Sequence, residues 1–300
     1  MYKVKVENKK QLDIALASKN VSEIILARDS FAECELAKLL ARIKKSGRLS
    51  WIMLERISRF EEKYDRKING SNERNSETAD LRKSTDRIFE IADLDGIIIQ
   101  NLDSFAYMLR KINKSANPNL SVELNYTINC YNDATKKVYQ TLYNEKRNNA
   151  KDIPLKFTAP VELNIYELSE VGYDTMLVYS YIDTMVSANC LKKNVSAVNN
   201  NDVGSPICKY RFDFDNVQDF SSYIIDRKGK KLHYKTYCKY CYNKIFNTEP
   251  LYLLDKVPEI ENISGFRLDF SFENENEMKA ILQNKIPDSF TRGHFKSQIK

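Results

Sequence analysis

Residues 96–124 read GIIIQNLDSFAYMLRKINKSANPNLSVEL, and this stretch decides the expected fold. It begins with Gly96–Gln100, a short apolar run rich in isoleucine, which is typical of a buried strand. Asp103 can cap the helix that follows, and Met108 lies on the apolar stripe of that helix. Leu120–Leu124 is a second strand-like run. The stretch therefore predicts one β-α-β unit, in which the two strands run parallel.

The same alternation of short apolar runs and amphipathic stretches continues on both sides of this unit. The other predicted strands are Tyr2–Val6, Glu23–Ala27, Trp51–Glu55, Leu155–Ala159, Thr175–Tyr179 and Gly265–Phe270. Eight strand–helix units predict an α/β protein, with a single closed (β/α)8 TIM-like barrel over residues 1–300. An open doubly wound sheet is the alternative, but the sequence has no Gly-x-Gly-x-x-Gly turn for a dinucleotide.

One long interruption, Val186–Leu254, separates the seventh predicted strand from the eighth. Its runs Lys209–Phe214, Ser222–Asp226 and Lys231–Tyr237, with a turn at Asp226–Gly229, predict a small antiparallel β-hairpin subdomain. Loops that follow barrel strands project from the carboxyl-end face, where active sites of such barrels lie. We therefore expect this insertion on the carboxyl-end face.

The composition is that of a chain with a sizeable core and a charged surface. Hydrophobic residues make up 42% and charged residues 29%, and the formal net charge is +6. The chain opens with the charged stretch Met1–Lys5 and has no apolar run near the ~20 residues of a membrane helix. These features predict a cytoplasmic protein with no membrane partner. A charge of this size does not by itself predict a nucleic-acid partner.

Four cysteines fall inside the insertion, between residues 186 and 254. They are Cys190, Cys208, Cys238 and Cys241, and the last two form a Cys-Lys-Tyr-Cys pair. In a reducing compartment such a group indicates metal or cluster ligands, because a C-x-x-C step brings two thiolates to one centre. A structural zinc and an iron–sulfur cluster both fit this donor set; unrelated buried cysteines and a redox dithiol are the other interpretations. Cys34 is expected in the core of the second helix.

The segment around the C-x-x-C pair is rich in basic and aromatic residues. The predicted RNA-binding residues are Lys230, Lys231, Lys235, Lys239, Tyr234, Tyr237 and Tyr240. Lysines can neutralise phosphates while tyrosine rings stack on unpaired bases. The alternative interpretation is a solvated hairpin whose tyrosines pack on the rim of the barrel.

Polar residues also stand near the carboxyl ends of three predicted strands. The candidate catalytic residues are Glu123, Asn125, Glu162, Asn164, Arg267 and Asp269. Such positions aim into the mouth of a barrel, where Arg267 could bind a substrate carboxylate with two parallel hydrogen bonds. The alternative is that Arg267 and Asp269 form an ion pair that closes the barrel.

Several segments, in chain order, are similar to one known family. They are Thr184–Cys190, the Asp226–Gly229 turn, Cys238–Asn247, Arg267–Phe270 with Glu273, and Thr291–Lys296. Together they resemble the long bacterial members of peptidase family U32, the collagenase-like peptidases. The late position of Cys208 departs from the pattern of that family, and so do Ser180 and Asp183.

The resemblance implies a barrel protein of the bacterial cytoplasm whose relatives carry a four-cysteine 4Fe–4S cluster and hydroxylate RNA bases or quinone precursors. It also implies that the chain is the C-terminal part of a larger enzyme, or works with a missing upstream domain or partner chain. By position, Cys190, Cys208, Cys238 and Cys241 would be the cluster ligands.

Three functions from different classes are therefore open at the level of sequence. The first is iron–sulfur-dependent RNA modification by base hydroxylation. The second is a collagenase-like peptidase acting on a peptide, although the sequence has only two histidines and no His-Glu-x-x-His or Gly-x-Ser-x-Gly motif. The third is a binding module without catalysis, built around a zinc knuckle.

Overall fold

The structure is a computed structural model that describes residues 1–57, 84–148, 152–188, 190–191 and 213–296. It is a mixed α/β fold built on two sheets, the larger of which has nine strands in the order β12-β7-β13-β1-β2-β3-β4-β5-β6. Apart from the short β12, the strands of this sheet pair in parallel. Their bounds are β1 Tyr2–Val6, β2 Val21–Ala27, β3 Leu49–Met53, β4 Gly96–Ile99, β5 Ser121–Leu124, β6 Lys156–Phe157, β7 Tyr173–Ser180, β12 Leu251–Tyr252 and β13 Ile263–Asp269.

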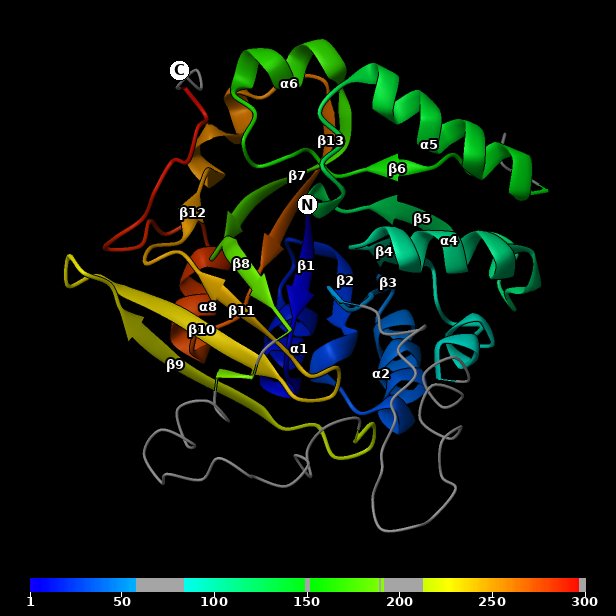
Figure 1. Cartoon of the computed structure of the whole chain (residues 1–300), viewed down its shortest axis with the longest axis horizontal. Helices are drawn as coiled ribbons and strands as arrows, with labels where there is room; N and C mark the ends of the chain where they lie inside the picture. Colours follow the sequence, from blue (N-terminus) through cyan, green and yellow to red (C-terminus); the bar gives the residue numbers. More distant parts are fainter. Residues whose placement is uncertain (58–83, 149–151, 189, 192–212, 297–300) are drawn as a thin grey trace.

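The large sheet curls, and helices lie on its outer side (Figure 1). Just past β6, Thr158 forms a parallel bridge with Thr175 of β7, and Ala159 N donates to Thr175 O at 2.8 Å. The helices are α1 Lys9–Ala17, α2 Glu33–Lys45, α4 Leu102–Lys111, α5 Asp133–Lys146, α6 Ile165–Val171 and α8 Glu275–Leu282. The predicted alternation of strands and helices is therefore confirmed, since each predicted strand overlaps an observed one.

The helix boundaries follow from local hydrogen bonds. Asn8 caps α1 by accepting from Gln11 N at 2.9 Å, and Gly47 takes the left-handed conformation (φ 79°) after α2. The predicted cap of α4 was wrong by two residues. Asn101, not Asp103, accepts from a backbone amide at the start of that helix. Cys34, predicted in the core of α2, is exposed.

The smaller sheet has four antiparallel strands in the order β8-β11-β10-β9. These are β8 Asp183–Ser187, β9 Asp219–Ile225, β10 Lys231–Tyr237 and β11 Tyr242–Phe246. The predicted hairpin is confirmed: β9 and β10 pair around a turn in which Asp226 Oδ1 accepts from Lys228 N and Lys230 N, both at 2.8 Å. The predicted run Lys209–Phe214 lies mostly outside the described residues.

The smaller sheet covers part of the carboxyl-end face of the large sheet, as expected for the insertion. Lys235 of β10 pairs with Glu7, which follows β1. Lys239 donates to the carbonyl of Arg28, which follows β2, and Tyr242 accepts from Arg56 N beyond β3. The two sheets therefore meet where the first three strands end (Figure 1). None of the described helices is both long enough and apolar enough to cross a membrane.

Candidate functional site

Four of the predicted catalytic residues converge inside the curled sheet. Glu123 of β5 is fully buried; its carboxylate accepts from Thr158 Oγ1 at 2.6 Å and pairs with Lys3 Nζ at 2.7 Å. Arg267 of β13 is fully buried too, with its guanidinium 3.7 Å from Glu123 Oε1. Arg267 also donates to Asn125 Oδ1 at 2.8 Å, and its Nε lies 3.0 Å from Asp269 Oδ1. These contacts form one continuous polar group at the carboxyl ends of the strands. We call its four predicted catalytic residues, Glu123, Asn125, Arg267 and Asp269, the mouth group.

Burial and charge act in opposite directions on the mouth group. Burial raises the pKa of Glu123, but Lys3 and Arg267 outweigh it, so the pKa lies below its ordinary value. The carboxylate therefore stays ionised between two cations. Ion pairing is the interpretation that the sequence left as the alternative for Arg267 and Asp269, and the observed 3.0 Å contact has that geometry.

The other two predicted catalytic residues do not join the mouth group. Asn164 is the N-cap of α6, where its side chain accepts from Tyr166 N at 2.9 Å and from Glu167 N at 3.1 Å. This is a structural capping role, and it corrects the prediction for Asn164. Glu162 lies in the loop just before that helix, and one of its carboxylate oxygens is buried without a hydrogen bond within the described structure.

The predicted RNA-binding residues do not share one surface. Lys230 and Lys231 are exposed at the tip of the hairpin, and Tyr234 is half-buried. By contrast, Lys235, Lys239, Tyr237 and Tyr240 are all buried. The prediction of a single lysine–tyrosine surface is therefore corrected, because most of its residues pack between the two sheets.

The buried half of this set makes ionic contacts with the large sheet. Lys235 pairs with Glu7 at 2.5 Å and with Asp219 at 3.1 Å. Lys239 is fully buried, pairs with Glu33 at 2.7 Å and donates to the carbonyls of Arg28 and Phe31, both at 2.7 Å. Nearby positive charge outweighs burial at Glu7 and holds its pKa well below the ordinary value. The lysines thus attach the small sheet to the large one.

The tip of the hairpin keeps a basic and aromatic surface. Arg227, Lys228, Lys230 and Lys231 are all exposed there. Lys231 Nζ lies 4.7 Å from the centre of the Tyr223 ring, and Tyr223 is 50% exposed. The tip therefore has both kinds of side chain expected of a surface that binds single-stranded nucleic acid, namely cationic groups and an exposed aromatic ring. We call these five residues the hairpin tip.

Three of the four predicted metal ligands lie in the described part of the chain. β8 pairs antiparallel with β11, and Ser187 stands opposite Asn243. Just beyond β8, Leu191 N donates to Asn243 Oδ1 at 3.4 Å, so Cys190 comes to the end of the sheet where Cys238 and Cys241 form the β10–β11 turn. Cys208 lies outside the described residues. Among the residues that are described, no three His, Cys, Asp or Glu side chains form a metal-binding group by themselves.

The C-x-x-C turn has an unusual backbone. Cys241 adopts φ 55°, in the left-handed region, and its N–H donates to Cys238 O at 3.2 Å. A residue with a Cβ is strained in this region, which glycine and asparagine tolerate best. The presence of a cysteine at such a position is an observation that favours a role for its sulfur. Thiolate is a donor that both zinc and iron–sulfur clusters accept, so the donor chemistry fits either group.

Sequence reasoning missed several residues of the carboxyl-end face. Lys3, Lys5 and Glu7 alternate along and just after β1, which in a strand predicts side chains on one face. That alternation could have identified them as members of a charged interior. Four further side chains meet at this face around the carboxylate of Asp183, and they carry no comparable pattern because they come from separate segments: Arg56, Tyr126, Asp183 and Lys244.

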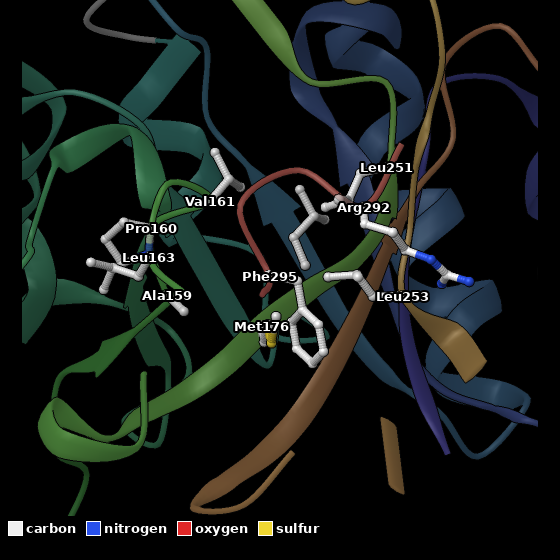
Figure 2. A pocket seen from close by; sticks show the side chains of 10 residues that line it. Ala159, Pro160, Val161, Leu163, Met176, Leu251, Leu253, Arg292 and Phe295 are labelled. Carbon is white, nitrogen blue, oxygen red and sulfur yellow. The ribbon is translucent and has the colours of Figure 1, made fainter. Parts of the chain in front are cut away.

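An apolar hollow lies elsewhere in the fold, between the segment after β6, strand β7 and the C-terminal segment (Figure 2). Ala159, Leu163, Met176 and Phe295 are among the side chains that line it. The guanidinium of Arg292 points away from this hollow, donating to Tyr252 O at 2.7 Å and to Asp255 Oδ2 at 2.8 Å. The hollow therefore offers no polar group for catalysis among its described lining.

Comparison with known proteins gives two weak likenesses to solved structures. No family profile matches the chain, and no curated protein matches it. An uncharacterised B. cereus protein is 10% identical with a TM-score of 0.38, covering 94% of this chain and 65% of that one. A D-psicose 3-epimerase, crystallised in the presence of D-fructose, is 12% identical with a TM-score of 0.34, covering 67% of this chain and 82% of that one. Because both TM-scores are below 0.5, neither likeness bears on the function.

Proposed function

We propose that this chain is a (β/α)8 barrel protein of the U32 type that carries an iron–sulfur cluster and modifies RNA in the cytoplasm. The barrel is supported by the parallel strands of the curled sheet and by the Thr158–Thr175 bridge, which joins β6 to β7. Base hydroxylation is the reaction that we propose. The proposal extends to a substrate site at the mouth group, since catalytic groups of such barrels lie at the carboxyl ends of the strands.

One observation carries the cluster proposal: the pairing of β8 with β11. That pairing brings Cys190 to the end of the small sheet that holds the Cys238–Cys241 turn, although some fifty residues separate them in sequence. We propose that Cys208 supplies the fourth thiolate. A cluster bound there would supply an electron-transfer centre or an iron that binds an anion. The residues of the chain would hold it at the edge of the carboxyl-end face.

The RNA part of the proposal is supported by the hairpin tip. Arg227, Lys228, Lys230 and Lys231 place four cationic side chains at one exposed turn, beside the exposed ring of Tyr223. Cations there would neutralise phosphates, and the ring offers a face for an unpaired base. This is a smaller surface than the sequence predicted, and it contains only Lys230 and Lys231 of the residues first proposed.

Anaerobic purification followed by a visible spectrum and by iron, sulfide and zinc analysis tests the cluster. We expect a brown protein with iron and sulfide, and we expect Cys190→Ser, Cys208→Ser, Cys238→Ser and Cys241→Ser each to lose most of the metal. Cys34→Ser is the matched control and should retain it, because Cys34 is exposed on α2. A colourless protein with one zinc would instead favour the zinc knuckle. A metal-free protein would contradict both the iron–sulfur cluster and the zinc knuckle.

Mass spectrometry of nucleosides tests the reaction. RNA from cells that lack the protein should lose one hydroxylated nucleoside, and the wild-type chain should restore it. Arg267→Met should not restore it, although the substituted chain must first be shown to keep its metal and its fold. Peptide cleavage by the purified chain, with unchanged RNA, would favour the peptidase instead.

A further inference from the structure

Two cations at the carboxyl-end face stand beside one carboxylate without bonding to it. Arg56 Nε lies 3.9 Å from Asp183 Oδ2, and Lys244 Nζ lies 4.0 Å from the same oxygen. Both distances are too long for a hydrogen bond. The other oxygen of Asp183 accepts from the hydroxyl of Tyr126 at 2.5 Å. These four residues follow β3, β5 and β7 or belong to the small sheet, so they meet only in the folded chain.

The donors of the two cations are not used up within the described structure. Lys244 is buried, with 9% of its side chain exposed, and its ammonium makes no hydrogen bond with any described residue. Its remaining contact is with the ring of Tyr237, whose centre is 5.4 Å from Nζ. Of the two cations, it is Arg56 that has a donor atom, Nε, buried without a hydrogen-bond partner in this part of the chain. A buried donor without an acceptor costs stability, and a ligand that accepts from it recovers that cost.

Arg56 is held in place by its neighbours. Its backbone N–H donates to Tyr242 Oη at 3.2 Å, and its carbonyl accepts from Asn101 Nδ2 at 3.3 Å. One guanidinium nitrogen donates to Gln100 O at 2.7 Å. Lys244 is fixed by β11, where it stands between Val186 of β8 and Lys235 of β10. Both cations are therefore positioned before a ligand arrives, which lowers the entropic cost of binding one.

The local charge favours an anion. Two positive charges face a single carboxylate, so one positive charge remains uncompensated in this cluster. Ammonium and guanidinium groups donate strongly to carboxylate and phosphate oxygens. We infer that Arg56 and Lys244 bind an oxyanion, a phosphate or carboxylate group of the substrate. Placing that group on a substrate rests on the proposed function, whereas anion binding itself does not.

The inferred site adjoins the mouth group. The ring of Tyr126 lies 6.0 Å from the guanidinium carbon of Arg267, and Tyr126 directly follows Asn125 in the chain. An oxyanion held by Arg56 and Lys244 would thus anchor a substrate whose next atoms face Arg267 and Asp269. Binding by a remote group of this kind can position the reacting part of a molecule.

Calorimetric titration of the purified full chain at low ionic strength, with inorganic phosphate and separately with acetate, tests this site. We expect at least one of the two anions to bind, and Lys244→Met and Arg56→Gln each to weaken it about tenfold. Lys137→Met is the matched control, because Lys137 is exposed on α5, and it should leave the affinity unchanged. If phosphate binds and acetate does not, the site takes a phosphate group of the ligand. If acetate binds and phosphate does not, the site takes a carboxylate group.

Asp183→Asn gives the sharpest outcome. This change removes the negative charge that competes with the ligand and keeps an oxygen for the hydroxyl of Tyr126, so it should tighten anion binding several-fold. A role in folding alone would not predict tighter binding. The inference is overturned if neither anion binds the wild-type chain, or if Lys244→Met and Arg56→Gln bind as the wild type does. If the chain binds phosphate but contains no metal, the anion site is supported and the proposed cluster is contradicted.

Discussion

The two ends of the β9–β10 hairpin use the same side chain in opposite ways. At the tip, Lys228, Lys230 and Lys231 are exposed. At the base, Lys235 is buried between Glu7 and Asp219, and Lys239 is buried against Glu33 and two backbone carbonyls. All five lysines lie within the twelve residues 228–239. The difference shows that one basic segment of sequence contains both a surface for a partner and a connection between two sheets.

The physical basis of this difference is the supply of acceptors. A buried ammonium group is tolerated only where carboxylates and carbonyls replace its lost water. The carboxyl ends of β1 and β2 provide those acceptors through Glu7, Arg28 and Phe31. The tip extends beyond this face, so its lysines remain in solvent. The following predictions test this division, from the largest expected effect to the smallest.

Replacement of Lys239 should have the largest effect. Lys239→Met leaves the carbonyls of Arg28 and Phe31 without their donor, and Glu33 keeps Arg28 and the hydroxyl of Tyr240 as partners. We expect a loss of about 3 kcal/mol in the free energy of unfolding, measured by urea denaturation. Lys228→Met at the tip should change it by less than about 0.5 kcal/mol. Equal effects of the two substitutions would contradict the division of the hairpin.

Replacement of the tip lysines should instead affect RNA. The triple substitution Lys228→Gln, Lys230→Gln and Lys231→Gln should lower affinity for single-stranded RNA about tenfold at low salt. It should also reduce the slope of log affinity against log salt by about 2, since three phosphate contacts are lost. Fluorescence anisotropy across a salt series measures both, and the unfolding free energy should stay near that of the wild type.

The matched control for the tip lies on the other side of the molecule. Lys114, Lys137 and Lys146 are exposed on and near α5, away from the small sheet (Figure 1). Their replacement by glutamine removes the same net charge. If this variant loses as much affinity as the tip variant, the attraction is a property of overall charge and the tip has no special role.

The arrangement of strands could be predicted from the sequence because its causes are local. Runs such as Gly96–Gln100 are apolar over the length of one strand, and the helices between them have clear apolar stripes, so periodicity alone identifies them. The turn at Asp226–Gly229 was predictable because its cause is also local: the side chain of Asp226 accepts hydrogen bonds from backbone amides within the turn.

The burial of Lys235, Lys239, Tyr237 and Tyr240 could not be predicted in this way. The partner of Lys235 is Glu7, which is 228 residues away in sequence. A lysine is normally a surface residue, and only the meeting of two sheets supplies the acceptors that allow its burial. The mouth group was partly predictable, since Arg267, Asp269, Glu123 and Asn125 stand at strand ends. Asn164 has the same position in sequence but serves as a helix cap.

The base of the hairpin should also respond to pH through Asp219. Burial, opposed by the nearby Lys235, raises the pKa of Asp219 to about 6, from an ordinary value of 3.8. The folded chain therefore binds this proton more tightly than the unfolded chain, so the contribution to stability is present at low pH and lost as pH rises through about 6. Between pH 7 and pH 5, Asp219 should add about 1 kcal/mol to the free energy of unfolding.

Urea denaturation at pH 5 and pH 7 measures this contribution. In Asp219→Asn the difference between the two pH values should shrink by about 1 kcal/mol relative to the wild type. Asp288→Asn is the control, because Asp288 is exposed, and its pH dependence should match the wild type. An unchanged difference in Asp219→Asn would mean that the carboxyl group is solvated in both states.

The smallest expected effect separates strain from ligation at the turn that joins β10 to β11. Cys241 adopts φ 55°, where glycine is free of the steric cost that a Cβ imposes. In metal-free protein, Cys241→Gly should therefore be more stable than Cys241→Ser by about 0.5–1 kcal/mol, because only glycine relieves that cost. In the protein as purified anaerobically, both variants should lose metal equally, since neither has a thiolate. A chain that becomes more stable as glycine and still binds its full metal would show that Cys241 is not a ligand. A chain that becomes more stable and loses the metal would show that the strained backbone is retained for the sulfur.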